Sequence, residues 1–172
     1  GENNMAHILG LLAVATFLWC FQLKSRKNII LVNLISRMLY ILQYVLLGAF
    51  EGATLDFMGF ATSFFAQHKD KPFITKYFKV IVVGVNILLI IVGLALYENI
   101  YSLFAILGIV FEVTALWLTK EKNIRLLSLA AAPMWLVYNL ANGAYFSIFG
   151  NVFVMISIGI AMYRLDRKEV AK

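Results

Sequence analysis

Two stretches of the sequence decide the fold: "LKSRKNIILVNLISRMLYILQYVLLGAF" (23–50) and "LTKEKNIRLLSLAAAPMWLVYNLANGAY" (118–145). They lie over each other without gaps when the chain is shifted by 95 residues. Identities between apolar stretches arise by chance, but this match also carries loop, turn and polar positions. Under the shift Lys27-Asn28-Ile29 falls on Lys122-Asn123-Ile124, Gly48-Ala49 on Gly143-Ala144, Tyr40 on Trp135, and Asp56 on Asn151. The sequence therefore predicts an internal repeat.

The rest of the chain consists of apolar runs long enough to cross a bilayer. Of the 172 residues, 62% are hydrophobic and only 14% are charged, whereas soluble domains carry about 25% charged residues. A transmembrane helix needs about 20 mostly apolar residues. Seven runs approach that length: 5–23, 29–48, 51–67, 78–97, 100–118, 125–144 and 147–163. We therefore expect an all-α membrane protein with seven transmembrane helices in a lipid bilayer.

The repeat arranges these runs as 3+1+3. The first three runs match the last three, and the fourth run is left as a linker. A unit of three spans ends on the side of the membrane opposite its start, and one linking span brings the chain back to the starting side. The two repeats are therefore predicted to be parallel, as in transporters whose sites lie between repeats. The predicted organisation is a three-helix repeat over 5–67, a linker with one helix over 68–99, a second repeat over 100–163 and a basic tail over 164–172.

Positive charge alternates along the chain. Apart from Arg37, every Lys and Arg follows an odd-numbered run: Lys24, Arg26 and Lys27; Lys69, Lys71, Lys76 and Lys79; Lys120, Lys122 and Arg125; and Arg164, Arg167, Lys168 and Lys172. The other side carries only Glu2, Glu51 and Glu98. The positive-inside rule then predicts an N-terminus outside and a C-terminus in the cytoplasm. The net charge of +6 is thus interpreted as a topology signal, and no nucleic acid is expected as a partner.

Three ionisable residues stand out because they lie well inside the predicted spans: Arg37, Asp56 and Glu112. Such groups are costly in hydrocarbon and are functional candidates by default. Arg37 and Glu112 both lie about 12–14 Å from the cytoplasmic end at about 1.5 Å per residue. An ion pair between them is therefore feasible, either as a structural link between the repeats or as a gate.

Asp56 and Asn151 occupy matching positions in the two repeats. Symmetry would place them across the central axis, where a carboxylate facing an amide suits a hydroxylated or amine-bearing ligand. The alternative is that Asp56 reaches interfacial water or caps its helix.

Aromatic and amide residues supply the other candidates. Tyr40 and Trp135 fall near mid-span, where their rings would stack on a solute or simply pack between helices. Asn139 lies one turn from Trp135 on the same helix face. The polar residues of these helices, which would line a site or join helices by hydrogen bonds, are Gln43, Tyr138, Asn139 and Asn142.

No enzyme constellation is present in the sequence. Cys20 is the only cysteine, and His7 and His68 stand in no metal-ligand spacing. We expect no catalytic activity, no metal and no cofactor.

Three segments carry a family resemblance: "FQLKSRKN" (21–28), "QYVLLGAFEGATLDFMGFATSF" (43–64) and "PMWLVYNLANGAY" (133–145). They resemble the YgjV-type bacterial inner-membrane proteins over about residues 8–165. The 3+1+3 plan is also similar to the SWEET and PQ-loop transporter superfamily. The chain departs from the latter because it has no Pro-Gln pair and because Pro133 is the only proline in the paired helices.

The resemblance implies a multi-pass protein of the bacterial inner membrane with a transporter-like architecture. In SWEET-like proteins the sugar pocket is lined at positions that correspond to Asp56, Asn151, Tyr40 and Trp135. We therefore expect a transporter or facilitator of a small polar solute, such as a sugar. The alternative is a receptor, sensor or assembly protein on the same fold, whose central axis would be packed with apolar side chains. Neither the substrate nor the oligomeric state follows from the sequence.

Overall fold

The computed structural model describes residues 2–48, 50–141 and 145–167, and every regular element in these ranges is a helix. Six residues that entered the sequence patterns lie outside the described residues: Ala49, Asn142, Gly143, Ala144, Lys168 and Lys172. The elements are α1 (Glu2–Gln22), α2 (Arg26–Leu46), α3 (Phe50–Gln67), α4 (Pro72–Lys76), α5 (Phe78–Ala95), α6 (Ser102–Trp117), α7 (Glu121–Ala141), α8 (Tyr145–Ala161) and a π-helical turn η1 (Met162–Asp166).

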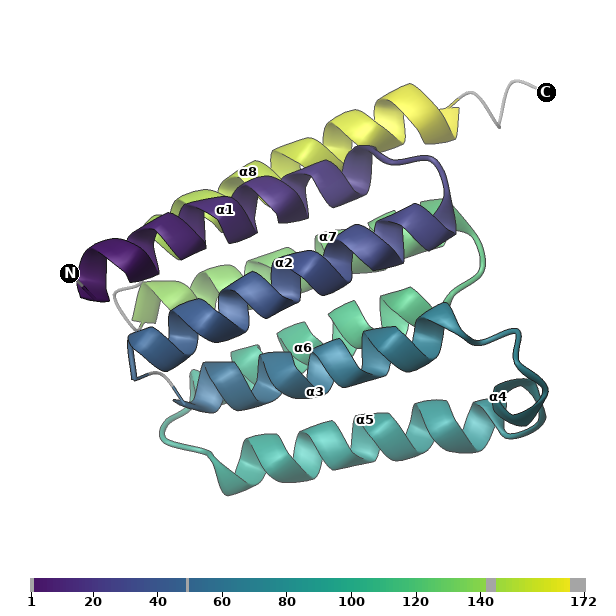
Figure 1. Ribbon diagram of the computed structural model, residues 1–172, viewed down its shortest axis with the longest axis horizontal. Helices are drawn as coiled ribbons and strands as arrows, with labels where there is room; N and C mark the ends of the chain where they lie inside the picture. The colour runs from purple at the N-terminus through teal and green to yellow at the C-terminus, as the bar shows by residue number, and fades with distance from the viewer. Residues whose placement is uncertain (1, 49, 142–144, 168–172) are drawn as a thin grey trace.

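Six helices form a closed ring. Helices α1, α2 and α3 lie side by side in one layer, and α8, α7 and α6 lie behind them in a second layer (Figure 1). The layers meet where α1 packs on α8 and where α3 packs on α6. Helix α5 stands outside the ring against α3 and α6. In this arrangement α2 and α7 occupy the middle of their layers, on opposite sides of the ring.

The outer surface of the ring is apolar. Large side chains such as Trp19, Phe57 and Ile156 are more than half exposed on it. On α5, only Leu89 and Gly93 are buried. An exposed apolar surface of this extent suits contact with lipid, because a soluble monomer rarely exposes large contiguous apolar patches.

Five of the described helices are long and apolar enough to cross a membrane: α1, α2, α5, α7, and α8 together with η1. Helix α6 has only 16 residues, and α3 is less apolar because it carries Glu51 and Asp56. Every predicted run does coincide with a helix. The prediction that all seven helices cross the membrane remains a prediction.

Several predicted boundaries were wrong by a few residues. Helix α2 begins at Arg26 and α7 at Glu121, so basic residues assigned to loops lie in first turns of helices. The short helix α4 was not predicted, although Pro72 at its start is favourable there, since proline lacks the N–H that a first turn leaves unpaired. The α2–α3 connection is tight because Gly48 has a φ of 72°, which residues with a Cβ disfavour.

The two ends of the helix bundle differ in charge. The two chain termini lie at opposite ends (Figure 1). The connections α1–α2, α3–α5 and α6–α7 lie at the same end as the C-terminus, and these connections carry the Lys- and Arg-rich segments. We call this the basic end and the other the outer end. The alternation of charge along the sequence therefore corresponds to the two ends of one bundle.

Candidate functional site

A cavity of about 40 Å³ lies at the centre of the ring. Each of the six ring helices contributes at least one residue to its wall. The lining residues are Phe17, Ser36, Arg37, Tyr40, Tyr44, Asp56, Glu112, Trp135, Asn139, Ser147 and Asn151. These side chains are polar or aromatic, whereas clusters of buried apolar residues pack between the ring helices elsewhere.

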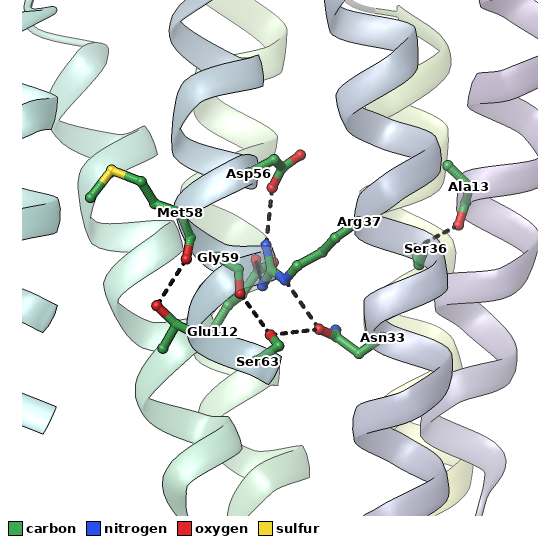
Figure 2. A network of polar contacts seen from close by, with 10 residues as sticks. Ala13, Asn33, Ser36, Arg37, Asp56, Met58, Gly59, Ser63 and Glu112 are labelled. Carbon is green, nitrogen blue, oxygen red and sulfur yellow. Dashed lines mark hydrogen bonds and ion pairs between the residues drawn. The ribbon is translucent and has the colours of Figure 1, made fainter. Parts of the chain in front are cut away.

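One wall of the cavity is a buried ionic network around Arg37 (Figure 2). The Nη1 of Arg37 donates to Oδ1 of Asp56 at 3.0 Å, and its Nη2 donates to Oε2 of Glu112 at 2.8 Å. Its Nε donates to Oδ1 of Asn33 at 3.1 Å. The guanidinium therefore links α2 to α3 and α6, and it crosses from one layer to the other.

A glycine makes room for this network. Gly59 of α3 faces Arg37 so closely that an added Cβ would lie 2.7 Å from Nη1. Beside it, Ser63 donates its hydroxyl to the Gly59 carbonyl at 2.8 Å. Ser36 donates to the carbonyl of Ala13 at 3.0 Å and so joins α2 to α1 (Figure 2).

The opposite wall is uncharged. Asn139 of α7 donates from Nδ2 to Oδ1 of Asn151 on α8 at 2.8 Å. The indole N–H of Trp135 is buried and has no hydrogen-bond partner among the described residues. It lies against Gly108, where an added Cβ would come within 2.7 Å of Nε1. The N–H is thus enclosed between α7 and α6, while the indole ring lines the cavity.

Aromatic rings complete the lining. Tyr40 and Tyr44 stack with centroids 6.2 Å apart, and the ring of Phe17 meets Tyr40 edge-on at 6.4 Å. Trp135 packs edge-on against Tyr138 at 5.8 Å. The cavity therefore offers carboxylates on one side, amides on the other and ring faces between them.

The structure brings most of the predicted site residues to this one cavity. Five of the six candidate solute-binding residues line it: Asp56, Asn151, Tyr40, Trp135 and Asn139. Arg37 and Glu112, whose pairing the sequence left open, are bonded there. The bond between Arg37 and Asp56 was not anticipated.

Gln43 is the candidate that lies elsewhere. Its side chain packs against Gly10 of α1, where an added Cβ would clash with Nε2. It lines a separate, mostly apolar hollow between α1 and α8. Tyr138 also points away from the cavity wall and donates its hydroxyl to Oε2 of Glu51 at 3.2 Å.

Two further arginines, at the basic end, were interpreted from sequence only as topology signals. Arg125 of α7 bonds Oδ1 of Asp166 at 2.6 Å and donates to the carbonyl oxygen of Leu23, just past the end of α1, at 2.9 Å. Arg26 of α2 donates to the carbonyl oxygens of Leu116 and Leu118, at the end of α6, at 2.6 and 2.9 Å. Such contacts satisfy carbonyl groups that a helix end leaves unpaired. Their positions near the starts of α2 and α7 were the only signal that the sequence held for these contacts.

Within the described ranges, His, Cys, Asp and Glu do not form a group of three or more placed to hold a metal ion.

Comparison with known proteins gives one match. A family model described as bacterial inner membrane protein, Imp-YgjV, matches residues 4–169. No curated protein and no solved structure matches the chain. The match covers nearly all of the sequence and agrees with a bundle of apolar helices that includes several candidate membrane spans. The chain therefore belongs to the YgjV family of multi-pass bacterial inner-membrane proteins.

Proposed function

We propose that this protein is a transporter or facilitator of a small polar solute and that the central cavity is its solute site. The single observation that carries the proposal is the lining of that cavity. All six ring helices contribute to it, and their side chains are polar or aromatic. A purely structural bundle would gain more stability by filling this axis with apolar side chains, since buried polar groups must be paired to offset their desolvation.

The proposed architecture is two parallel three-helix repeats joined by α5, similar to SWEET proteins. In its support, the bounds of α2 and α7 differ by 95 residues at both ends, and α3 and α8 also begin 95 residues apart. Exchanging the two repeats turns the α1–α8 contact into the α6–α3 contact, and both contacts occur. The cavity positions Tyr40 and Trp135, and Asp56 and Asn151, are matched pairs under the same shift.

Seven membrane spans, with the N-terminus outside and the C-terminus in the cytoplasm, are part of the proposal. The polar residues that make α3 less apolar are buried in the bundle, as Glu51 and Asp56 illustrate. The exposed surface of α3 carries Phe57, Phe64 and Phe65. A helix whose charged groups face inward is compatible with lipid contact.

Transport requires the two repeats to move apart. At about 40 Å³ the cavity has room for about three water molecules, so a solute the size of a sugar needs a wider state. At the basic end, Arg26 joins α2 to α6 and Arg125 joins α7 to α1, so both contacts cross between the repeats. We interpret them as contacts that break when the cavity opens toward the cytoplasm.

Thermal unfolding of the purified protein in detergent tests the solute site. A panel of sugars, amino acids, nucleosides, amines and vitamins is added to the wild type and to the variants Asp56→Ala and Asn151→Ala. A ligand at 100 times its Kd stabilises the folded state by about 2.7 kcal/mol, which shifts the unfolding curve measurably. The proposal predicts a stabilising solute whose effect is lost in both variants. Equal stabilisation of both variants would place the site elsewhere.

Labelling of single cysteines tests the topology. Cys20→Ala removes the only cysteine, and Glu98→Cys or Lys24→Cys then adds one exposed thiol at the outer or the basic end. A membrane-impermeant maleimide should label Glu98→Cys in intact cells and Lys24→Cys only after permeabilisation. The reverse pattern would invert the proposed orientation.

A further inference from the structure

The cavity has an unbalanced charge. Three of its lining residues are charged, and these are one cation, Arg37, and two anions, Asp56 and Glu112. With all three ionised, the wall carries a net charge of minus one. An uncompensated charge is costly away from bulk water. The site therefore favours one additional positive charge.

Each carboxylate keeps one oxygen available for that charge. Arg37 bonds Oδ1 of Asp56 and Oε2 of Glu112. Oδ2 of Asp56 and Oε1 of Glu112 have no partner among the described residues. Figure 2 shows the second Asp56 oxygen directed away from Arg37. Neither oxygen is among the fully enclosed polar atoms that lack a partner, so both remain within reach of a ligand in the cavity.

The remaining lining suits an organic cation better than a metal ion. The rings of Phe17, Tyr40, Tyr44 and Trp135 line the same cavity as the carboxylates. Aromatic faces attract ammonium groups by cation–π interaction, whereas a metal ion would need a fuller set of oxygen ligands.

We propose that the cavity binds a small organic ammonium ion against Asp56 and Glu112, and that the empty cavity holds one proton on Asp56 instead. This inference rests on the proposed function, because it names the substrate class of the same site. Binding of the ammonium ion releases the proton to water, and loss of the ammonium ion allows a proton to return. Cation and proton therefore compete for one site, which is the arrangement of an exchanger.

The charged and titratable groups that face Asp56 determine where the competing proton binds. The charged and titratable side chains that face it are Arg37, Tyr40 and Tyr44 on α2 and Glu112 on α6. Helix α5, which also packs on α3, carries only Lys79, in its first turn at the basic end. The competing proton is therefore assigned to Asp56, the more buried of the two carboxylates.

Calorimetry with charge-matched probes tests the inference. The full-length protein in detergent is titrated with methylammonium, ethylammonium and tetramethylammonium chlorides, and with methanol, ethanol and tert-butanol as neutral partners of similar size. Sodium chloride controls for ionic strength and for a metal cation. Repeating each titration at pH 6 and pH 8, in two buffers with different ionisation enthalpies, measures the protons released on binding.

The expected result is binding of at least one ammonium ion and of none of the alcohols. Its affinity should rise with pH, by up to tenfold per pH unit where the proton competes, with close to one proton released at the lower pH. Asp56→Asn and Glu112→Gln each remove one negative charge and should weaken ammonium binding at least tenfold. Glu98→Gln removes an exposed carboxylate at the outer end and should leave binding unchanged.

Contradictory outcomes separate this inference from the proposed function. Equal binding of ammonium ions and alcohols, or stabilisation by sugars without any binding of ammonium ions, would overturn the inference and leave the solute site in place. Preferential binding of sodium, or binding without proton release at either pH, would also overturn it. If no solute of any charge binds, both the inference and the proposed function fail.

Discussion

Two buried arginines, Arg37 and Arg125, show how the same side chain serves two purposes in one bundle. Their exposed fractions are 3% and 2%, so neither is a surface charge. Arg125 bonds one carboxylate, that of Asp166, and backbone carbonyl oxygens at the end of α1. Arg37 bonds two carboxylates and an amide, and it lines a cavity. The first site pairs one cation with one carboxylate and closes a helix end, while the second has two carboxylates for one cation and lines a cavity.

The largest expected effect on stability is at Arg37. Arg37→Met leaves Asp56 and Glu112 buried without a counter-charge, and loss of one partner in a buried ionic network costs about 3–5 kcal/mol. Thermal or denaturant unfolding in detergent measures the loss. As a control, the triple variant with Asp56→Asn and Glu112→Gln should regain most of it. A loss below about 1 kcal/mol for Arg37→Met would mean that the network contributes little, because an intact network predicts several times more.

The corresponding change at Arg125 should cost less. Arg125→Met leaves one carboxylate without a counter-charge, where Arg37→Met leaves two, so we expect about 1–3 kcal/mol. Adding Asp166→Asn should restore part of the loss. A larger loss of stability for Arg125→Met than for Arg37→Met in the same assay would contradict the expectation that the central network contributes more to stability.

Packing against Arg37 is tested by a pair of glycines. Gly59→Ala puts a methyl group 2.7 Å from Nη1 of Arg37, and overpacking of this kind costs about 1–3 kcal/mol. Gly84 of α5 has no atom within 4 Å of an added Cβ, so Gly84→Ala should stabilise its helix by about 0.5–1 kcal/mol. Unfolding of the two variants side by side gives the sign of each effect. Stabilisation by both substitutions would show that Arg37 is free to move away from α3.

The smallest expected stability change is at Asp56. In Asp56→Asn, Arg37 keeps Glu112 as its partner and the network becomes neutral, so the loss should be at most about 1 kcal/mol. Asp166→Asn, by contrast, leaves Arg125 without any carboxylate and should cost more. Comparing the two unfolding midpoints tests whether the central site has an excess carboxylate, which Arg37 does not need as a partner. A larger loss for Asp56→Asn would contradict that excess.

The sequence predicted the helices well because their signals are local. Apolar run length and the alternation of basic segments identified seven helices and two oppositely charged ends. Where the runs were broken by inward-facing polar groups, as at Glu51 and Asp56, the hydropathy signal weakened. Some predicted helix boundaries were wrong because a residue such as Arg26 begins one helix while its side chain bonds a carbonyl oxygen at the end of another.

The site was harder to predict because it depends on how each helix is rotated about its axis. The 95-residue shift found the matched pairs Tyr40 and Trp135, and Asp56 and Asn151, which line one cavity. The shift carries no information about neighbours across the ring, so the bond between Arg37 and Asp56 remained hidden. For the same reason it did not show that Gln43 turns toward α1.

The most direct test of a solute path through the ring is the reactivity of a cysteine inside the cavity. Asn151→Cys in the Cys20→Ala background places a thiol on the uncharged wall without disturbing the Arg37 network. An impermeant methanethiosulfonate reagent is applied to right-side-out and to inside-out membrane vesicles. The account predicts reaction from both sides, because the cavity opens alternately to each. Reaction from neither side, or from one side only, would contradict a transport path through the ring.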